Sequence, residues 1–542
     1  MTSSAHDVVV IGGGVTGAGI ARDLARRGAS VLLLEKGDYG GGTSGASSWM
    51  IHGGPRYLEF DWRTTRLSAQ DAGKIVTIAR HMVHRVVFLI PVMPGDKHNI
   101  ERLETAMEVY DRFQPLKLSN SHLRLTTAEA RQLEPGLSDQ MVGAMTMEEW
   151  GVDPHRLTFA NVQDAVENGG RALNHSRVVD LIRDGPNVLG VRYRAADGGL
   201  NEARARVTVN ATGPWSPILG KLAGVPIHLR PAKGIHVVYD RRVSNFAISC
   251  DAVDGRGLLM VPHGNFTLAG TTDDDFYGDP DDIEVQPDEV DYILQAFDRV
   301  MPSLRRHRAI RATAGVRPTI FRWRSYEDDL SRRYQILDHA ADDAPGLVSV
   351  IGGKLSMYRL MAEQATDLVC ARLGIDAACT TGTAPLPGSE VAAEPPDELA
   401  ARYGITALAA ARLQTRQGCR APRIFDGRPE RALVCRCEPI TVAELAHAAR
   451  SEQVRTLSDA FRRVGLAAGP CSGALCVERA AEVVGRELGW SLGQRREAAA
   501  EFRSELWLGR APVLDRWGWA EQELIAGSRA RLVSDQPPGV GR

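Results

Sequence analysis

The sequence predicts an α/β fold in three parts: a Rossmann-type nucleotide-binding domain, a strand-rich second domain and a small C-terminal domain with four cysteines. A glycine-rich βαβ pattern opens the chain, alternating strand patterns fill its middle, and two pairs of cysteines stand near its carboxyl end. The 542 residues are enough for roughly three or four domains with ample buried core.

The composition is that of an ordinary globular protein. Apolar residues make up 44% and charged residues 24%, and the formal net charge of −2 argues against a nucleic-acid-binding surface. The first residues, MTSSAHD, lack the charged and apolar regions of an export signal, and no apolar run approaches the ~18 residues of a membrane span. We therefore expect a cytoplasmic location without a transmembrane segment, compatible with a peripheral position on the inner face of the cell membrane.

The opening βαβ pattern spans residues 8–35 and has the features of a dinucleotide-binding unit. Gly12, Gly14 and Gly17 follow the GxGxxG spacing, in which they allow a tight turn, the approach of a pyrophosphate and close packing of the helix on the strand. Glu35 ends the second strand, where a carboxylate accepts hydrogen bonds from a ribose. NAD and FAD share this fingerprint, so it does not name the cofactor by itself.

Three later segments of the chain are also expected to contact the nucleotide. A polar loop offers hydroxyl groups to a phosphate or a flavin ring, and two strands run into turns of the Ala-Thr-Gly and Gly-Gly type, the second at the start of a long helix. These three further contacts with the nucleotide favour FAD as the cofactor. A lysine at a helix amino terminus also stabilises negative charge on a reduced flavin ring. The residues expected at the cofactor beyond the fingerprint are Thr43, Ser44, Ser47, Ala211, Gly213, Gly352, Gly353, Lys354 and Leu355.

The expected substrate domain is the strand-rich segment 227–330, with one helix at 288–301. Cationic and titratable side chains there, and in the loop after the fingerprint, are candidates for an active-site wall, although each alone resembles ordinary surface charge. These candidates are His52, Arg56, Tyr57, His236 and Arg317.

The remaining body is expected to be largely helical. Apolar spacing predicts helices over 64–85 and within 99–140, and Asp153 with Pro154 forms the cap and first turn of another. A segment rich in alanine, proline and arginine follows the body near residue 385, and we interpret it as a linker.

Four cysteines cluster after this segment. Cys435 and Cys437 form a CxC pair, and Cys471 and Cys476 form a CxxxxC pair. Structural zinc sites usually take pairs with gaps of two to four residues, so the CxC pair favours a [2Fe-2S] cluster over zinc or an empty site. A cluster also accepts the two electrons of a reduced flavin one at a time.

Through these motifs the chain resembles the FAD-dependent glycerol-3-phosphate dehydrogenase family, and within it the A-subunit branch of the anaerobic enzymes. The motifs at 51–57, 152–157, 231–234, 270–273, 315–318 and 352–355 occur in the family's order, and the cysteine pairs resemble its bacterioferritin-associated-ferredoxin-like module. Two features depart from this branch: the chain reads GLAAGP at 465–470 where a GMG-type turn is usual, and its 52–57 loop is closer to the aerobic branch.

The resemblance implies FAD-dependent oxidation of sn-glycerol 3-phosphate to dihydroxyacetone phosphate. It implies electron transfer through the iron–sulfur centre to quinone, with membrane-anchor or electron-transfer subunits as partners. Among the catalytic residues, His52 suits the base because an ordinary imidazole titrates near neutrality, and His236 is the reserve. The remaining catalytic roles fall to Arg317 and Lys354, and Arg317 together with Arg56 is expected to hold the substrate phosphate. The substrate-binding groups are Arg56, Tyr57, His236 and Arg332.

Two alternatives stay open on the sequence alone. One is an FAD-dependent oxidase or dehydrogenase of a 2-hydroxy acid or an amino acid, whose carboxylate the same arginines would bind. The other is a flavin- and cluster-bearing electron-transfer subunit without catalysis. The expected domains are an oxidoreductase at 1–385 (FAD parts 1–80, 150–226 and 331–385; substrate part 227–330), a linker at 386–430, a [2Fe-2S] domain at 431–485 and a helical tail at 486–542.

Overall fold

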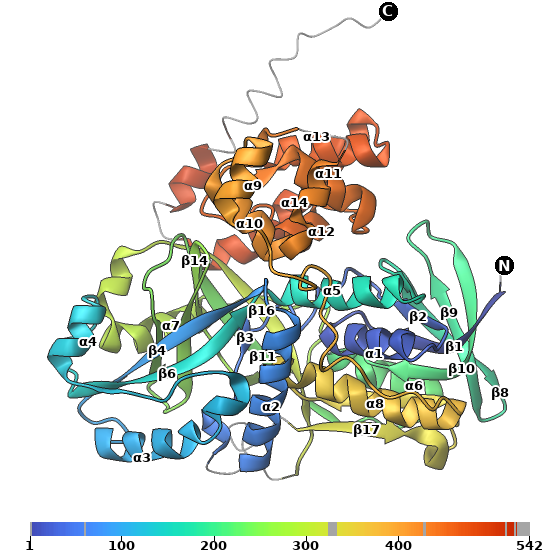
Figure 1. Cartoon of the computed structure of the whole chain (residues 1–542), viewed down its shortest axis with the longest axis horizontal. Coiled ribbons are helices and arrows are strands. Elements are labelled where there is room, and N and C mark those ends of the chain that lie inside the picture. The colour runs from blue at the N-terminus through green and yellow to red at the C-terminus, as the bar shows by residue number, and fades with distance from the viewer. Residues whose placement is uncertain are drawn as a thin grey trace, which may run out of the picture.

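Two sheets form the body of the protein, and a helical C-terminal unit lies against it (Figure 1). The structure is a computed structural model that describes residues 3–58, 61–323, 333–426, 430–514, 518–524 and 527, without the side chains of Ser3, Ser4 and Arg56. In Figure 1 the C-terminal helices, in orange and red, pack together above the body.

The first sheet contains the predicted nucleotide-binding unit and has the strand order β17-β18-β10-β1-β2-β7. Strand β1 pairs in parallel with β2 and β10, and β10 pairs in parallel with β18. The strands of this sheet, with the hairpin β8-β9 that extends it, are β1 (Ser3–Ile11), β2 (Val31–Leu34), β7 (Arg171–Leu173), β8 (Arg177–Asp184), β9 (Asn187–Arg194), β10 (Leu200–Asn210), β17 (Tyr334–Asp338) and β18 (Leu347–Gly352).

Apolar side chains cover both faces of β1, as the unbroken run in its sequence predicts. Val8 and Val10 pack into the core formed with helices α1 (Val15–Arg26), α5 (Pro154–Glu167) and α8 (Tyr358–Leu373). Val9 and Ile11 face the opposite side and pack near α6 (Ser216–Ala223). The Asp153 side chain accepts hydrogen bonds from the backbone N–H groups of the first turn of α5, so the predicted cap is confirmed.

The second sheet takes strands from two distant parts of the chain. Its order is β15-β11-β14-β13-β12-β4-β6-β3, with β16 beside β11 and β5 beside β6, and α7 (Pro287–Val300) packs against it. The predicted substrate segment supplies β11 (Leu229–Tyr239), β12 (Ala247–Asp251), β13 (Gly257–His263), β14 (Phe266–Gly270), β15 (Asp274–Asp275) and β16 (Ala309–Ile320). Earlier residues supply β3 (Met50–Ile51), β4 (Val83–Val92), β5 (Arg124–Leu125) and β6 (Gly143–Val152).

One of the two helix predictions in this region needs correction, and the other is confirmed. Helix α2 (Trp62–Ile78) ends before 85, because the apolar run that follows it pairs as strand β4 with β6. Residues 99–140 hold the short helices α3 (Ile100–Asp111) and α4 (Thr127–Leu133), separated by the 3-10 helix η2 (Gln114–Lys117) and strand β5.

The prediction of a linker at 386–430 is wrong for much of its length. It contains α9 (Pro396–Tyr403), α10 (Ala407–Gln417) and the 3-10 helix η8 (Gly418–Phe425). The reason is that Leu399, Leu413 and Phe425 form a core of their own, which the prolines ahead of α9 do not interrupt. The rest of the C-terminal unit consists of β19 (Leu433–Cys435), β20 (Ile440–Thr441), α11 (Val442–Ser451), α12 (Leu457–Val464), α13 (Val477–Leu488) and α14 (Leu492–Arg510).

Buried ion pairs join the C-terminal unit to the body. Arg463 of α12 donates two hydrogen bonds, of 2.6 and 2.9 Å, to the carboxylate of Asp38, and Arg462 adds a third at 2.7 Å. Arg156 of α5 similarly meets Glu452 at 2.9 Å. The two arginines hold the pKa of Asp38 well below its ordinary value against the opposing effect of burial, so this carboxylate is charged at neutral pH.

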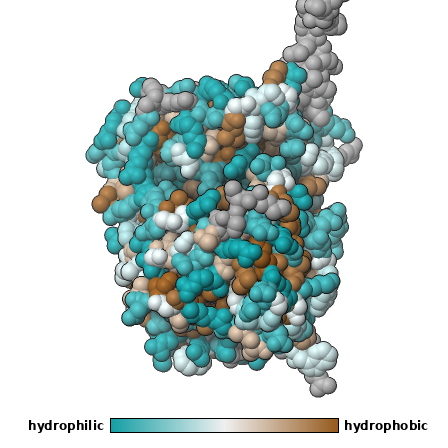
Figure 2. Space-filling model, turned by 90° about the vertical axis from the view of Figure 1, so that its right-hand side faces the viewer, coloured by the Kyte–Doolittle hydropathy of each residue, from teal (hydrophilic) through white to brown (hydrophobic). Residues whose placement is uncertain are grey.

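The face shown in Figure 2 is mostly hydrophilic, with apolar side chains gathered around its middle. Within the described residues, no helix combines the length and the apolar character needed to cross a membrane.

We expect Arg463→Met to lower the free energy of unfolding by about 3 kcal/mol at neutral pH, because it removes the main partner of a buried carboxylate. Asp38 has a depressed folded-state pKa, so its contribution is present above its unfolded pKa of about 3.9 and is lost as the pH falls. Urea unfolding should therefore show the difference from wild type shrinking in acid. Arg486→Met, which breaks an exposed pair with Glu430, is the control and should cost less than about 1 kcal/mol.

Candidate functional site

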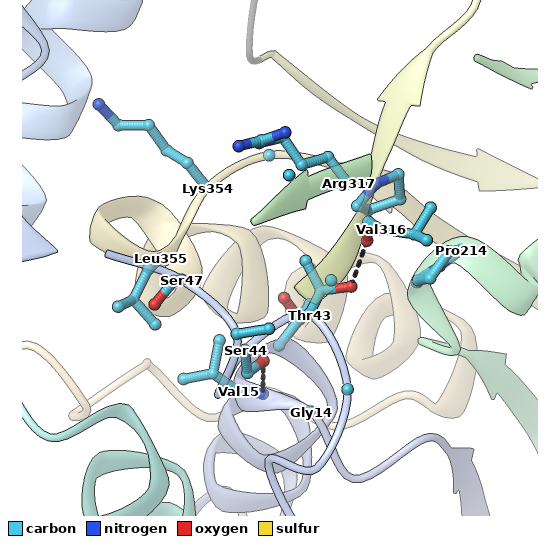
Figure 3. Close-up of a pocket in the computed structure, with 18 of the residues that line it drawn as sticks. Gly14, Val15, Thr43, Ser44, Ser47, Pro214, Val316, Arg317, Lys354 and Leu355 are labelled. Carbon is cyan, nitrogen blue, oxygen red and sulfur yellow. Dashed lines mark hydrogen bonds between the residues drawn. The ribbon is translucent and has the colours of Figure 1, made fainter. Parts of the chain in front are cut away.

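A cavity of about 1090 Å³ lies between the two sheets and reaches the C-terminal unit. Its walls include the turn after β1, the loop at 41–48, the turn after β10 and the turn after β18. Figure 3 shows side chains from these four regions around one space. Arg462 of α12 and Glu505 of α14 also line it, so the C-terminal unit contributes to the same cavity.

The glycines of the turn after β1 allow backbone segments to approach closely. Gly12 has φ of 103°, and a Cβ there would lie 2.6 Å from the carbonyl oxygen of Ala211. Gly14 lines the cavity and is the N-cap of α1, whose amino terminus therefore borders the space. Gly17 is outside the lining; a Cβ there would lie 1.9 Å from the Gly12 carbonyl oxygen, so this glycine allows close packing of α1.

Glu35 lies where a ribose contact is expected. Its carboxylate lines the cavity and accepts hydrogen bonds from the backbone N–H groups of Gly13 at 2.6 Å and Gly37 at 2.8 Å. Desolvation raises the pKa of Glu35, and these two donors oppose the shift. The next residue, Lys36, lies 3.8 Å from the ring centre of Trp215, and both line the same cavity.

The hydroxyl-rich loop joins the nucleotide turn to the second sheet. Ser44 accepts a hydrogen bond from the backbone N–H of Val15 at 3.0 Å, and Thr43 donates one to the carbonyl oxygen of Val316 at 2.6 Å (Figure 3). Ser47 lies on the cavity wall beside them. The loop thus holds hydroxyl groups at the cavity and fixes the spacing between the two sheets.

The turn after β18 completes the wall. Gly352 and Gly353 have φ values of 77° and 83°, which suit glycine, and the 3-10 helix η7 (Leu355–Met357) then leads into α8. Within the described part of the chain, the buried Ser356 hydroxyl and the Trp215 indole N–H have no hydrogen-bond partner, and both residues line the cavity. Orphaned polar atoms, glycines in the cavity lining and the amino terminus of α1 fit a bound flavin dinucleotide.

His52, Tyr57 and Lys354 meet at one end of the cavity. The Lys354 ammonium donates to the backbone carbonyl of His52 at 3.2 Å and lies 4.9 Å from the Tyr57 ring centre. The His52 loop is held in turn by Glu149 of β6, which accepts from the Gly53 N–H at 3.3 Å.

Glu149 is a site residue that the sequence reasoning missed. It is buried, lines the cavity and pairs with Lys117 at 2.6 Å and with the Tyr110 hydroxyl. No local motif marks it, because its partners come from elements about 30 to 40 residues earlier in the chain.

Arg317 of β16 lines the same cavity and is held in a fixed orientation. Its guanidinium donates to Asp273 at 3.0 Å, to the Thr271 hydroxyl at 2.8 Å and to the Thr272 carbonyl at 3.0 Å. It also lies over Gly234 of β11, where a Cβ would come within 2.3 Å of the guanidinium. Thr271 and Asp273 line the cavity but were absent from the predicted site; the motif at 270–273 was the available signal.

His236 is buried at the same cavity. Its Nε2 lies 2.8 Å from the Ser48 hydroxyl, and burial together with the Arg317 charge lowers its pKa to about 3. A group with so low a pKa is a weak proton acceptor near neutrality. This weighs against His236 as the base.

The structure brings most of the predicted cofactor and substrate residues to one cavity. Arg332 lies outside the described residues, and so does the side chain of Arg56. Those that line the cavity are Gly12, Gly14, Glu35, Thr43, Ser44, Ser47, His52, Tyr57, Ala211, Gly213, His236, Arg317, Gly352, Gly353, Lys354 and Leu355.

The four predicted metal ligands lie together in two pairs. A hydrogen bond with Cys476 lowers the pKa of Cys435 to about 6, while burial raises the pKa of Cys437, which contacts Cys471, to about 11. Four thiols are the donor set of a [2Fe-2S] cluster. Among the described residues, no group of three or more His, Cys, Asp or Glu side chains could hold a metal ion, so the cluster rests on the donor chemistry of the four thiols and stays a prediction.

Two family models match the chain. The model described as FAD dependent oxidoreductase covers residues 7–353, and the model described as C-terminal domain of alpha-glycerophosphate oxidase covers residues 379–495. The second match includes the helices α9 and α10 and the four cysteines, so it treats the segment after the body as part of a domain.

Known proteins resemble the chain over nearly its whole length. It is 36% identical to the A subunit of the anaerobic glycerol-3-phosphate dehydrogenase of Escherichia coli (strain K12), covering 96% of this chain and 95% of that protein. It is 30% identical to the aerobic glycerol-3-phosphate dehydrogenase of Bacillus subtilis (strain 168), over 86% and 88%. The solved glycerol-3-phosphate dehydrogenase of Bacillus halodurans, complexed with FAD, superposes with a TM-score of 0.76 at 26% identity and covers 94% of this chain and 96% of that one.

We expect Glu35→Ala to weaken FAD binding about tenfold or more, because a hydrogen bond to a charged group contributes about 1.5–3 kcal/mol. Titration of the flavin-free protein with FAD measures the change. Glu497→Ala, at an exposed position of α14, should leave the affinity unchanged. Equal affinities for wild type and Glu35→Ala would remove Glu35 from the cofactor site.

Proposed function

The chain belongs to the FAD-dependent oxidoreductase family that includes the glycerol-3-phosphate dehydrogenases, and from this premise we propose that it oxidises sn-glycerol 3-phosphate to dihydroxyacetone phosphate. The observation that carries this proposal is the match of 36% identity across 96% of the chain. The cavity supports it, since two cations, Arg317 and Lys354, line it together with His52, and Lys354 contacts the His52 carbonyl.

Arg317 is our choice for the substrate phosphate. A guanidinium presents a planar fork of donors that suits bidentate contact with phosphate. Its hydrogen bonds to Asp273 and Thr271 fix the plane of that fork before a substrate arrives. Lys354 adds a point charge, and we assign Arg56, Tyr57 and Arg332 to the same substrate pocket.

His52 is our choice for the base. Oxidation of the C2 alcohol removes a hydroxyl proton and a hydride, and a bound FAD supplies the hydride acceptor. Glu149 holds the backbone at Gly53, and Lys354 holds the His52 carbonyl. The imidazole is thus carried on a backbone that is fixed from two sides, which suits proton removal from a positioned hydroxyl.

The same observations weigh against the two alternatives. Oxidases of amino acids and 2-hydroxy acids bind a carboxylate, whereas the whole-length relatives of this chain are named for a phosphate substrate. An electron-transfer subunit without catalysis would have no use for a substrate end in which Arg317, Lys354 and His52 lie around one cavity.

Beyond the flavin, we propose that the four cysteines hold a [2Fe-2S] cluster and that electrons leave through it towards quinone. The grouping of four thiols beside the body supports this step. The relative in Escherichia coli is named as one subunit of its enzyme, which supports further electron-transfer or membrane-anchor subunits here as well. We propose a peripheral position on the cytoplasmic face of the membrane, with a catalytic body to about residue 385 and a C-terminal unit after it.

The test of this function is reduction of the bound flavin by substrate. We expect sn-glycerol 3-phosphate to bleach the flavin band of the anaerobically purified protein, while glycine and 2-hydroxyglutarate leave it oxidised. In His52→Gln the rate should fall by about 10²–10⁴, as expected for loss of a general base. A flavin that stays oxidised with glycerol phosphate would contradict the proposed substrate, and an unchanged rate in His52→Gln would contradict the role of His52.

We expect Arg317→Lys to raise the KM for glycerol 3-phosphate about ten- to a hundredfold, because a lysine cannot make the bidentate contact. Steady-state kinetics with a dye acceptor measures this change. Arg241→Lys, at an exposed arginine of the same domain that pairs with Asp240, is the matched control. If both variants keep the wild-type KM, Arg317 does not bind the phosphate.

A further inference from the structure

Arg311 of β16 is buried at the junction between the body and the C-terminal unit. Only 8% of the residue is exposed. One guanidinium nitrogen donates to the carbonyl oxygen of Ala468 at 2.8 Å, and the guanidinium carbon lies 5.7 Å from the ring centre of Phe461. The Nε atom has no hydrogen-bond partner among the described residues.

Arg311 differs from the other buried arginines in how its charge is compensated. Six of them each pair with a carboxylate within 3 Å, and Arg311 makes no such pair within the described part of the chain. These six are Arg22, Arg27, Arg156, Arg359, Arg416 and Arg463.

The charge of Arg311 is therefore only weakly compensated. Burial lowers its pKa to about 10 against the opposing effect of the Glu438 carboxylate, so the side chain still carries its charge at neutral pH. A buried cation without an anion in contact is strongly unfavourable, which indicates that a further anion belongs nearby.

The loop that Arg311 contacts is the one that covers the cysteines. Ala467 has φ of 64°, and its N–H forms hydrogen bonds with the sulfurs of both Cys435 and Cys476. Gly469 lies so close to Cys437 that a Cβ there would come within 2.5 Å of the Cys437 Cβ. Ala468 stands between these two residues, so the hydrogen bond from Arg311 holds the centre of the cysteine-covering loop.

An anion is what the cysteine site would hold when filled. An iron–sulfur cluster bound by four thiolates carries net negative charge, and it gains one more on reduction. A cation fixed close to the cluster in a dry interface favours the more negative form. The charge of Arg311 would therefore raise the reduction potential of the site.

We propose that Arg311 is a positioning residue for the four-cysteine centre: the body supplies, through one buried guanidinium, both the anchor of the Ala467–Gly469 loop and the positive charge that raises the potential of the cluster. This inference rests on the cluster assignment made above. Arg311 lies six residues before Arg317 on β16, about 20 Å along the strand. The same strand therefore carries one cation at the substrate end of the cavity and a second cation near the cysteines.

The experiment is a redox titration of the anaerobically purified full-length protein, followed by electron paramagnetic resonance of the reduced cluster. Arg311→Met removes the charge and keeps most of the side-chain volume, while Arg311→Lys keeps the charge. The matched control is Arg308→Met, which removes an exposed arginine just before the same strand. Iron content and flavin content are measured on every variant.

We expect Arg311→Met to lower the potential of the cluster by about 59 mV or more, a tenfold change in a one-electron equilibrium, with a smaller shift in Arg311→Lys and none in Arg308→Met. Loss of iron from Arg311→Met alone, with flavin retained, would support the anchoring role. Equal potentials in Arg311→Met and wild type, or equal shifts in Arg311→Met and Arg308→Met, would overturn the inference about Arg311. Neither result would contradict the assignment of the cluster. Wild-type protein without iron or a paramagnetic signal would overturn the cluster and the inference together.

Discussion

The arrangement of the whole molecule depends on the buried carboxylate of Asp38. It lies three residues after Glu35, in the segment that follows β2, and its charge is matched by Arg462 and Arg463 of the C-terminal unit. A buried carboxylate in contact with two guanidinium groups leaves little freedom of position, because separating them would strand charge in a dry interface. The glycine-rich part of the cavity wall and the cysteine-bearing unit are therefore joined through one side chain, and Arg462 itself lines the cavity.

At the substrate end of the cavity, buried polar contacts between distant parts of the chain again hold the structure in place. Each group assigned to chemistry is held by a partner from another part of the chain: Arg317 by Asp273, the His52 loop by Glu149, and Glu149 by Lys117. These supporting contacts are buried and polar, so the site is organised before any ligand binds. The cations that would attract a phosphate are thus fixed in direction as well as in charge.

Local patterns predicted those parts of the fold that depend on local physics. The βαβ unit and the Asp153 cap follow from glycine spacing and cap chemistry, and both are present. The patterns failed at 79–85 and 386–430, where pairing with β6 and packing around Leu413 decide the outcome. Glu149 and Arg311 were missed for the same reason: their importance comes from partners far away in sequence, and a single carboxylate or arginine carries no periodic signal.

The interleaving of the two sheets has a consequence for how the chain is made. Strands β3 to β6 enter the second sheet, β7 to β10 belong to the first, β11 to β16 return to the second, and β17 and β18 complete the first. Strand β10 can pair with β18 only after the chain has been made to Gly352, and β4 can pair with β12 only after β12 has been made. The last strand of the second sheet ends at Ile320 and that of the first sheet at Gly352, about three fifths and two thirds of the way along the 542 residues. Unpaired strand edges therefore persist through much of synthesis, a period in which nascent chains of this topology are prone to aggregation and dependent on chaperones.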